Sequence, residues 1–361
     1  MLRIKKIDWY IIKKFLGTFF YSIILLTVII VVFDVSEKIS DFIEKKATLH
    51  EIIFDYYLNF IPYFVNTFSS LFTFISVIFF TSKMASKTEI VPILSGGISF
   101  YRFLYPYILS GLFITLFSFS LMNYVIPHTN RGLRDFEKKY IHNPFIVRES
   151  NLHMQISPNQ FIYVENYNNP SKIGYRFSAE QFEDGRLVQR FKSDVIRWDS
   201  AINKWVVSNY EIRNFYEDHE TIQTGSRVDT LMGFYPSDFV LDIEDAKVMT
   251  YKELKEFINK EKLKGSQFVQ KFEVERYKRI TFPLANIILT LIGVSLSSRK
   301  VRGGIGIHLG LGIVIAFTYI FLQQVTGVAA LYSKAPLWLI MWLPNIIYAV
   351  LAVFLLKMAP K

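Results

Sequence analysis

The chain has 361 residues and a formal net charge of +10, and 51% of its residues are hydrophobic and 17% aromatic. Its mean hydropathy of +0.26 is rare in a soluble enzyme of this length, so the composition indicates a membrane protein. The sequence contains no cysteine, which excludes disulfides, thiolate chemistry and cysteine-ligated zinc or iron–sulfur sites.

The hydrophobic residues are concentrated in six runs, each close to the roughly 20 residues that a transmembrane helix needs. The runs comprise residues 15–33, 52–81, 100–126, 280–296, 305–325 and 337–356. Pro127 predicts that the third run ends there, because proline interrupts a helix. A polar block separates the third and fourth runs. The order predicts three spans, an extramembrane domain and three further spans.

Basic residues flank these runs in four sets, which fall on one side of the membrane if there are six spans. The sets are Arg3, Lys5, Lys6, Lys13 and Lys14; Lys83, Lys87 and Arg102; Arg299, Lys300 and Arg302; and Lys357 and Lys361. The positive-inside rule then places both termini in the cytoplasm and the polar block outside it. The positive charge serves topology, and no nucleic-acid partner is expected.

The polar block alternates between apolar and polar residues at 160–167, 204–216 and in part at 187–198. Turn residues separate these stretches, which predicts an all-β domain built as a sandwich, jelly roll or barrel. After it, Thr250 and Glu253 fit a capping box. They predict an amphipathic helix over about 251–264, whose apolar side carries Leu254, Phe257, Ile258 and Leu263.

Motifs for catalysis are missing from the sequence. It has no G-x-x-x-x-G-K-[ST] loop and no G-x-S-x-G motif, and its six histidines are scattered without metal-ligand spacing. No acid or base lies well inside a predicted span, which argues against an ion relay. We therefore expect a protein that is not an enzyme, binds no metal or cofactor, and takes the energy for any transport from a partner.

Several stretches resemble the lipopolysaccharide-export permeases of the LptF/LptG (YjgP/YjgQ) type, and together they cover almost the whole length. They are Ile7-Asp8-Trp9-Tyr10-Ile11 at the first span, the segment from Lys87 to Ser99, Tyr124-Val-Ile-Pro127 with Arg134, Phe161-Ile-Tyr-Val and Lys204-Trp-Val-Val. The short length and the Leu331-Tyr-x-x-x-Pro336 loop favour the LptG type within this family.

This resemblance implies a bacterial inner-membrane protein with six helices, three plus three, and an inserted periplasmic β-jelly-roll domain. It implies that two such permeases pair and that a cytoplasmic ATPase dimer, which alone binds ATP, docks beneath them. The pair would extract lipopolysaccharide from the outer leaflet of the inner membrane. Periplasmic jelly-roll bridge proteins would receive it, and a single-span protein can join the complex.

The resemblance also implies a coupling helix at about 84–97, in which Glu89 pairs with a basic group of the ATPase. Ile90, Ile93 and Leu94 would supply apolar contacts there. Pro92 departs from the family pattern and is tolerated only in the first turn, so the helix should begin near Thr88 or Glu89. Gly96 and Gly97 predict its end. An ordinary solvated glutamate is the simpler reading of Glu89.

A cavity for a phosphorylated lipid needs basic residues, and Arg134, Arg131, Lys38 and Arg276 are the candidates. Each of them could instead extend to lipid headgroups. Residues 161–163 are candidates for a jelly-roll interior that receives lipid, although aromatic strand residues are more often plain core.

The predicted domains are residues 1–135, 136–248, a linking helix at 249–278, and 279–361. An alternative function is a membrane-anchored periplasmic scaffold or receptor that transports nothing. A permease that transmits force without moving lipid is a third reading, although such proteins usually carry their extramembrane domain after the first span. Association with an ATPase would separate the transporter from the scaffold.

Overall fold

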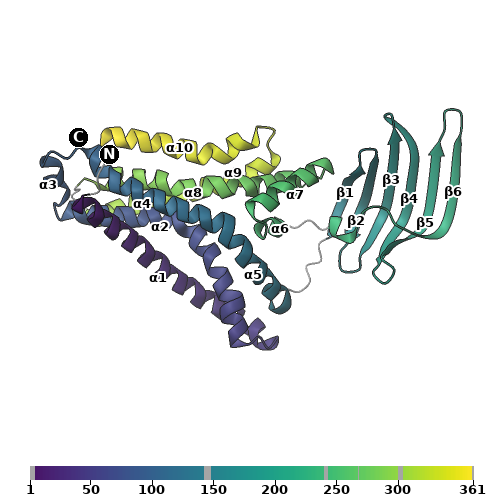
Figure 1. Ribbon diagram of the computed structural model, residues 1–361, viewed down its shortest axis with the longest axis horizontal. Coiled ribbons are helices and arrows are strands. Elements are labelled where there is room, and N and C mark those ends of the chain that lie inside the picture. The colour runs from purple at the N-terminus through teal and green to yellow at the C-terminus, as the bar shows by residue number, and fades with distance from the viewer. Residues whose placement is uncertain (1–4, 142–147, 240–242, 267, 300–303, 360–361) are drawn as a thin grey trace. The chain divides into compact units, whose positions relative to one another are not determined.

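The computed structural model describes residues 5–141, 148–239, 243–266, 268–299 and 304–359. The chain divides into two compact units. The helical unit comprises Met1–Ile141, Lys247–Tyr251 and Val274–Lys361, and the β unit comprises His142–Ala246 and Lys252–Glu273. Figure 1 labels the elements of both units.

Within these described ranges, six helices are long and apolar enough to cross a membrane, which confirms the predicted number of spans. They are Lys6–Glu44, Glu51–Ser86, Phe100–Tyr140, Val269–Ser297, Ile305–Tyr332 and Leu337–Met358. Their elements are α1 (Lys6–Glu44), η1 (Glu51–Tyr57), α2 (Leu58–Ser86), α4 (Phe100–Ser120), η2 (Leu121–Val125), α5 (Ile126–Tyr140), α8 (Val269–Ser297), α9 (Gly304–Tyr332) and α10 (Leu337–Met358).

The predicted end of the third span at Pro127 was wrong, because the helix continues to Tyr140. The π-helical segment η2 precedes Pro127 and leaves the proline in the first turn of α5, where its missing N–H is tolerated. Phe136 and Tyr140 then pack with Phe42 and Tyr56. Residues 136–141, which the sequence assigned to the β domain, therefore belong to the helical unit.

Two further apolar clusters join the spans of the helical unit. One joins the starts of α1 and α4 to the end of α2 and includes Phe15, Met84 and Phe103. The other joins α2, α8, α9 and α10. Close approach of α8 to α2 requires Gly293, since a Cβ there would lie 2.9 Å from a Val77 methyl.

In the β unit, six strands form one antiparallel sheet in the order β1-β2-β3-β4-β5-β6. The strands are β1 (Arg148–Ser157), β2 (Gln160–Asn168), β3 (Ile173–Glu183), β4 (Arg186–Asp199), β5 (Lys204–Phe215) and β6 (Glu220–Thr230). The expected inserted β domain is thus present. Each described strand pairs with its neighbour in sequence, whereas a jelly roll joins two sheets through Greek-key crossovers.

Aromatic residues fill the core of the β unit on one face of the sheet. Trp205 is fully buried, and its indole N–H donates to the carbonyl of Phe234 at 2.9 Å. Phe234 and Phe239, from the chain after β6, pack on this face together with Phe177 and Tyr167. The segment containing η3 (Pro236–Asp238) therefore covers part of the sheet.

Helix α7 (Tyr251–Leu263) follows α6 (Ile243–Lys247) and starts where the capping box predicted. Leu254 and Ile258 are buried as expected, but Leu263 is 79% exposed and Glu261 is buried instead. Gly265, with φ +65°, ends the turn before α8. The linking segment predicted at 249–278 is therefore two helices, α7 and the start of α8.

The end of α7 covers the outer edge of β1. The Gln155 N–H donates to the Lys264 carbonyl at 2.8 Å. The Lys264 ammonium lies 3.0 Å from an Asp238 oxygen and 3.3 Å from a Glu261 oxygen. Burial opposes the charge of Lys264, but the hydrogen bond and charge of Asp238 and the charge of Glu261 outweigh it, so its pKa is raised.

Candidate functional site

The segment between the second and third spans contains a helix of six residues, α3 (Ile90–Ser95). It starts after Thr88, which has φ +58°, and stops before Gly97, which has φ +84°. Pro92 is the third residue of α3 and so lies in its first turn. The helix expected at 84–97 is therefore shorter than predicted, because residues 84–86 complete α2 and a left-handed residue separates the two helices.

The side chains of α3 divide between the core and the surface. Ile90 is 2% exposed and belongs to the cluster formed by α1, α2 and α4, and Ile93 and Leu94 pack against it. Val91 is 61% exposed. The apolar residues expected to contact an ATPase, Ile90, Ile93 and Leu94, thus anchor α3 to this chain. The sequence did not predict that Val91 points outward, because a helix of six residues is too short to show a hydrophobic periodicity.

Two polar contacts connect the region of α3 to the starts of α1 and α4. The Tyr10 hydroxyl donates to Glu89 Oε2 at 3.3 Å. The Arg102 guanidinium donates to both carboxylate oxygens of Asp8, at 2.8 and 2.5 Å. The Asp8 side chain is 2% exposed, and its Oδ2 also accepts the Lys5 N–H at 2.7 Å. Asp8 and Arg102 are oppositely charged and each lies at the start of a span, a pattern in the sequence that could have predicted this ion pair.

The same end of the helical unit carries a buried histidine. His308 Nδ1 on α9 lies 2.8 Å from the Ser82 hydroxyl in the last turns of α2. Figure 1 shows the starts of α1 and α9 and the end of α10 at the end of the unit that carries α3. Leu356 and Ala359, at the end of α10, pack in the same apolar cluster as Ile90. The segment between spans two and three thus packs against the ends of several spans of the helical unit.

A second polar group lies around η1. The Lys38 ammonium lies 3.0 Å from Asp34 Oδ1 and contacts the Tyr56 hydroxyl. Tyr56 and Tyr57 both donate to Asp34, at 3.2 and 3.1 Å. Lys38, a predicted phosphate ligand, is therefore paired within the chain, and its side chain is only 19% exposed.

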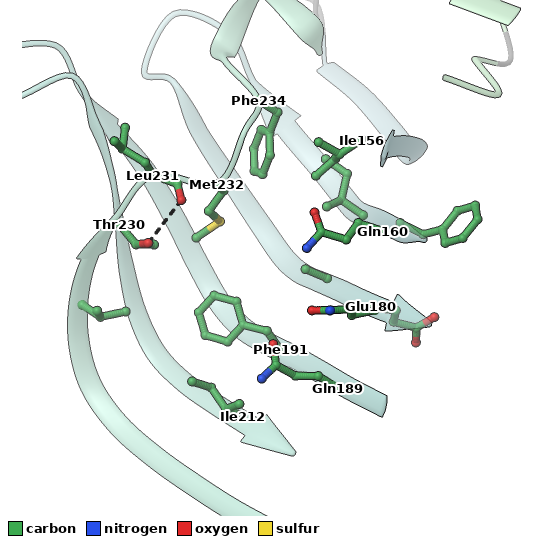
Figure 2. Close-up of a pocket in the computed structure, with 15 residues that line it drawn as sticks. Ile156, Gln160, Glu180, Gln189, Phe191, Ile212, Thr230, Leu231, Met232 and Phe234 are labelled. Atoms are coloured by element: carbon green, nitrogen blue, oxygen red, sulfur yellow. Dashed lines mark hydrogen bonds between the residues drawn. The ribbon is translucent and has the colours of Figure 1, made fainter. Parts of the chain in front are cut away.

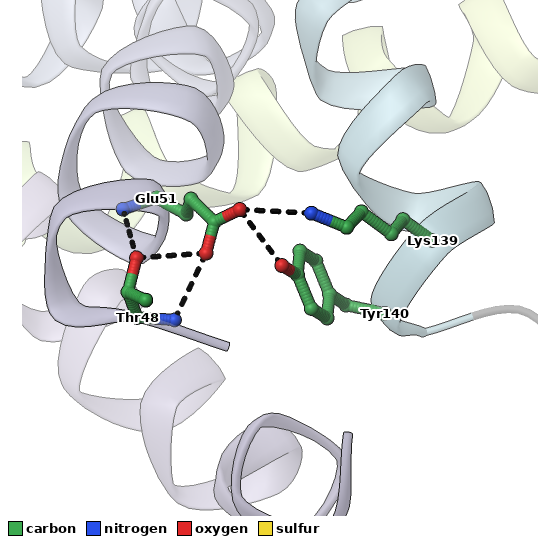
Figure 3. Close-up of polar contacts among 4 residues, drawn as sticks. All are labelled: Thr48, Glu51, Lys139 and Tyr140. Carbon is green, nitrogen blue, oxygen red and sulfur yellow. Dashed lines mark hydrogen bonds and ion pairs between the residues drawn. The ribbon is translucent and has the colours of Figure 1, made fainter. Parts of the chain in front are cut away.

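Glu51 connects η1 to α5, as Figure 3 shows. It accepts hydrogen bonds from the Thr48 N–H and hydroxyl, from Lys139 at 2.9 Å and from the Tyr140 hydroxyl at 2.8 Å. Together with the Asp34 contacts, it fixes the connection between the first two spans against α5. No sequence pattern predicts this pairing, since Glu51 and Tyr140 are 89 residues apart.

A cavity of about 320 Å³, with a mainly apolar lining, lies on the sheet of the β unit. Figure 2 shows it between the strands and the segment after β6. Phe161 and Ile162 line it, and Ile162 also belongs to the core of the β unit, while Tyr163 donates to Asn151 at 2.8 Å. Its other apolar lining includes Phe191, Ile212 and Met232, and the polar lining includes Gln160, Glu180 and Gln189.

The sequence matches the family described as lipopolysaccharide export system permease LptF/LptG over residues 9–358. This chain belongs to the LptF/LptG family. No curated protein gave a significant match. The match confirms the family resemblance, and with the six long helices it identifies a multi-pass inner-membrane permease of the lipopolysaccharide export system.

The predicted basic residues of this LptF/LptG permease have different surroundings. Arg131 on α5 donates to the Val248 carbonyl at 2.9 Å. Arg134 is half-buried on the same helix. The Arg276 guanidinium on α8 lies 5.3 Å from the centre of the Tyr277 ring. Among the described residues, no group of three or more His, Asp or Glu has a metal-binding arrangement.

Proposed function

We propose that this chain is one of two LptF/LptG permeases of an ATP-driven exporter, and that it is of the LptG type. The pair extracts lipopolysaccharide from the outer leaflet of the inner membrane and passes it to periplasmic jelly-roll bridge proteins. A separate cytoplasmic ATPase dimer supplies the energy, and a single-span protein can join the complex. Because the basic residues flank one side of the six spans, both termini face the cytoplasm and the β unit faces the periplasm.

The structure of α3 is the observation that carries this proposal. Ile90 anchors the helix in the core of α1, α2 and α4, while Val91 remains 61% exposed and Glu89 half-exposed. A short helix with an exposed apolar residue and an acidic residue at its start suits a groove on a partner that offers an apolar floor and a basic rim. A force applied to α3 would reach three spans through that core. We assign to Glu89 and Val91 the contact with the ATPase.

Purification of the complex from its native membrane tests this proposal. Glu89→Lys should abolish co-purification of the ATPase while the permease stays in the membrane at its normal level. Glu37→Lys makes the same charge change on an exposed residue of α1 and should leave the ATPase bound. A permease that never co-purifies with an ATPase would favour the scaffold alternative.

We further propose that the cavity of the β unit accepts acyl chains of the lipid. Its lining of Phe161, Phe191, Ile212 and Met232 is apolar, and its volume of about 320 Å³ lies in the range of small-ligand pockets. A photoreactive residue at Phe191 should cross-link to lipopolysaccharide during ATP hydrolysis. The same residue at Lys192, which is exposed and adjacent on β4, should not. Equal cross-linking at the two positions would refute this route.

The phosphates of the lipid would meet basic residues near the outer ends of the spans. We propose Arg134, Arg131, Lys38 and Arg276 for this contact. Lys38 would have to exchange Asp34 for a phosphate, since its ammonium lies 3.0 Å from that carboxylate. Charge reversal at Arg134 should reduce export, and unaltered export in this variant would remove Arg134 from the site.

A further inference from the structure

Side chains from the first turns of α1 and α4 make polar contacts next to α3. Tyr10 on α1 bonds to Glu89, the residue immediately before α3. Asp8 and Arg102 join α1 to α4, and Ile93 and Ile98 line the same small recess as this ion pair. The helix is thus bordered by one polar contact before its first residue and by a partly buried ion pair beside its last turn.

The ion pair is built to keep a fixed geometry. Two parallel N–H···O bonds between a guanidinium and a carboxylate define both distance and orientation. The Lys5 N–H bonds to the same carboxylate, and the Ser99 hydroxyl accepts the Arg102 N–H at 3.3 Å at the start of α4. The first turns of α1 and α4 are therefore linked to each other where α3 ends.

The exposure of α1 differs between its two halves. Phe15, Phe19 and Ile23 are buried in the cluster that also contains Ile90. Further along α1, Val28, Val32 and Phe33 are more than half exposed within this chain. A displacement at the first turn would therefore move the buried half together with α3, and would carry the remainder of a 39-residue helix with it.

We propose that Asp8, Arg102 and Tyr10 are positioning residues that fix α3 to the first turns of α1 and α4, so that a displacement of α3 is passed along α1. This inference rests on the proposed function of α3 as the ATPase contact. In this role the three residues act through α3. Their loss should uncouple ATP hydrolysis from lipid movement while the ATPase stays bound.

A distance measurement tests the positioning directly. Because the chain has no cysteine, Ser95→Cys at the end of α3 and Tyr21→Cys can carry a pair of spin labels in the full complex, and both sites are exposed. Tyr10→Phe removes only the hydroxyl and should broaden the distance distribution about twofold. Tyr101→Phe, an equal change at an exposed tyrosine of α4, should leave it unchanged.

Reconstitution of the complex with lipopolysaccharide gives the second readout, the lipid released per ATP hydrolysed. Tyr10→Phe should lower this ratio about threefold, as expected for one net hydrogen bond, with ATPase association retained. Asp8→Asn should lower it about tenfold, and the double variant Asp8→Arg with Arg102→Asp should restore part of it, which a loss of packing alone would not allow.

The outcomes separate the two proposals. Unchanged distances and an unchanged ratio in Tyr10→Phe would overturn the positioning role, and this variant gives that answer even if Asp8→Asn fails to assemble. Full ATPase association in Glu89→Lys would instead overturn the role of α3 as the ATPase contact. A broadened distribution together with a lowered ratio in Tyr10→Phe supports the inference.

Discussion

The hydroxyl of Tyr167 lies in the core of the β unit, where the side chain is 1% exposed and packs on Phe239. Within the part of the chain that the structure describes, this hydroxyl has no hydrogen-bond partner. Burial raises the pKa of the Tyr167 phenol to about 12. The phenol therefore stays neutral in the folded unit at pH values where it ionises in the unfolded chain.

We predict that Tyr167→Phe raises the free energy of unfolding at pH 7 by about 1 kcal/mol, because it removes a buried hydroxyl without a partner. The raised pKa gives the sign of the pH effect. Below the unfolded pKa of about 10, this phenol does not change the free energy of unfolding with pH. As the pH rises from there towards about 12, the phenol ionises in the unfolded chain only, and the free energy of unfolding of the wild type falls. Thermal unfolding of the purified permease between pH 7 and 11 should therefore show a steeper alkaline loss in the wild type than in the variant.

Trp205 provides the matched contrast in the same core. Its indole N–H donates to Phe234, and its ring contacts Trp198 and Phe239. Trp205→Phe should lower the free energy of unfolding by about 2 kcal/mol, through lost volume and an unpaired carbonyl. Equal effects of the Trp205 and Tyr167 variants would contradict this account of the core.

Among the elements, the bounds of α3 depend on Pro92 in its first turn and on Gly97 just after its end. Gly97 has φ +84°, a conformation that costs an ordinary residue about 1 kcal/mol. Pro92 lies in the first turn, where its missing N–H has no helical partner to lose.

Gly97→Ala should therefore destabilise the helical unit by about 1 kcal/mol and weaken ATPase association, whereas Pro92→Ala should change both by little. Melting of the detergent-solubilised protein and co-purification of the ATPase measure the two effects. A larger loss for Pro92→Ala than for Gly97→Ala would show that proline, and not glycine, defines this helix.

Element type was predictable where hydrophobic length or alternation is strong, as in the six spans and in β2, β4 and β5. The π-helical segments η1 and η2 were not, because apolar composition does not reveal a change in hydrogen-bond register. Strand β6 was missed since its burial pattern is mostly exposed. At the candidate site, the sequence predicted a role for Glu89. It did not predict the hydrogen bond from Tyr10 to Glu89, because the two residues are 79 positions apart in the sequence.

For the whole molecule, membrane orientation is the property that the distribution of basic residues predicts. Single cysteines can be introduced into a background without native ones. Ser86 at the end of α2 and Ile202 between β4 and β5 are both exposed. A membrane-impermeant maleimide should label Ile202→Cys in spheroplasts and Ser86→Cys only in inverted vesicles. The reverse pattern would invert the topology and place α3 out of reach of a cytoplasmic ATPase.

The consecutive strand order of the sheet has a consequence for how the β unit reaches its native state. Each of the five strand pairings joins neighbours in sequence, so the loops that must close are short. Low contact order speeds folding, and hairpins can add one at a time. With no cysteine available for a disulfide, such a local folding path shortens the time in which the β unit can aggregate before its core is complete.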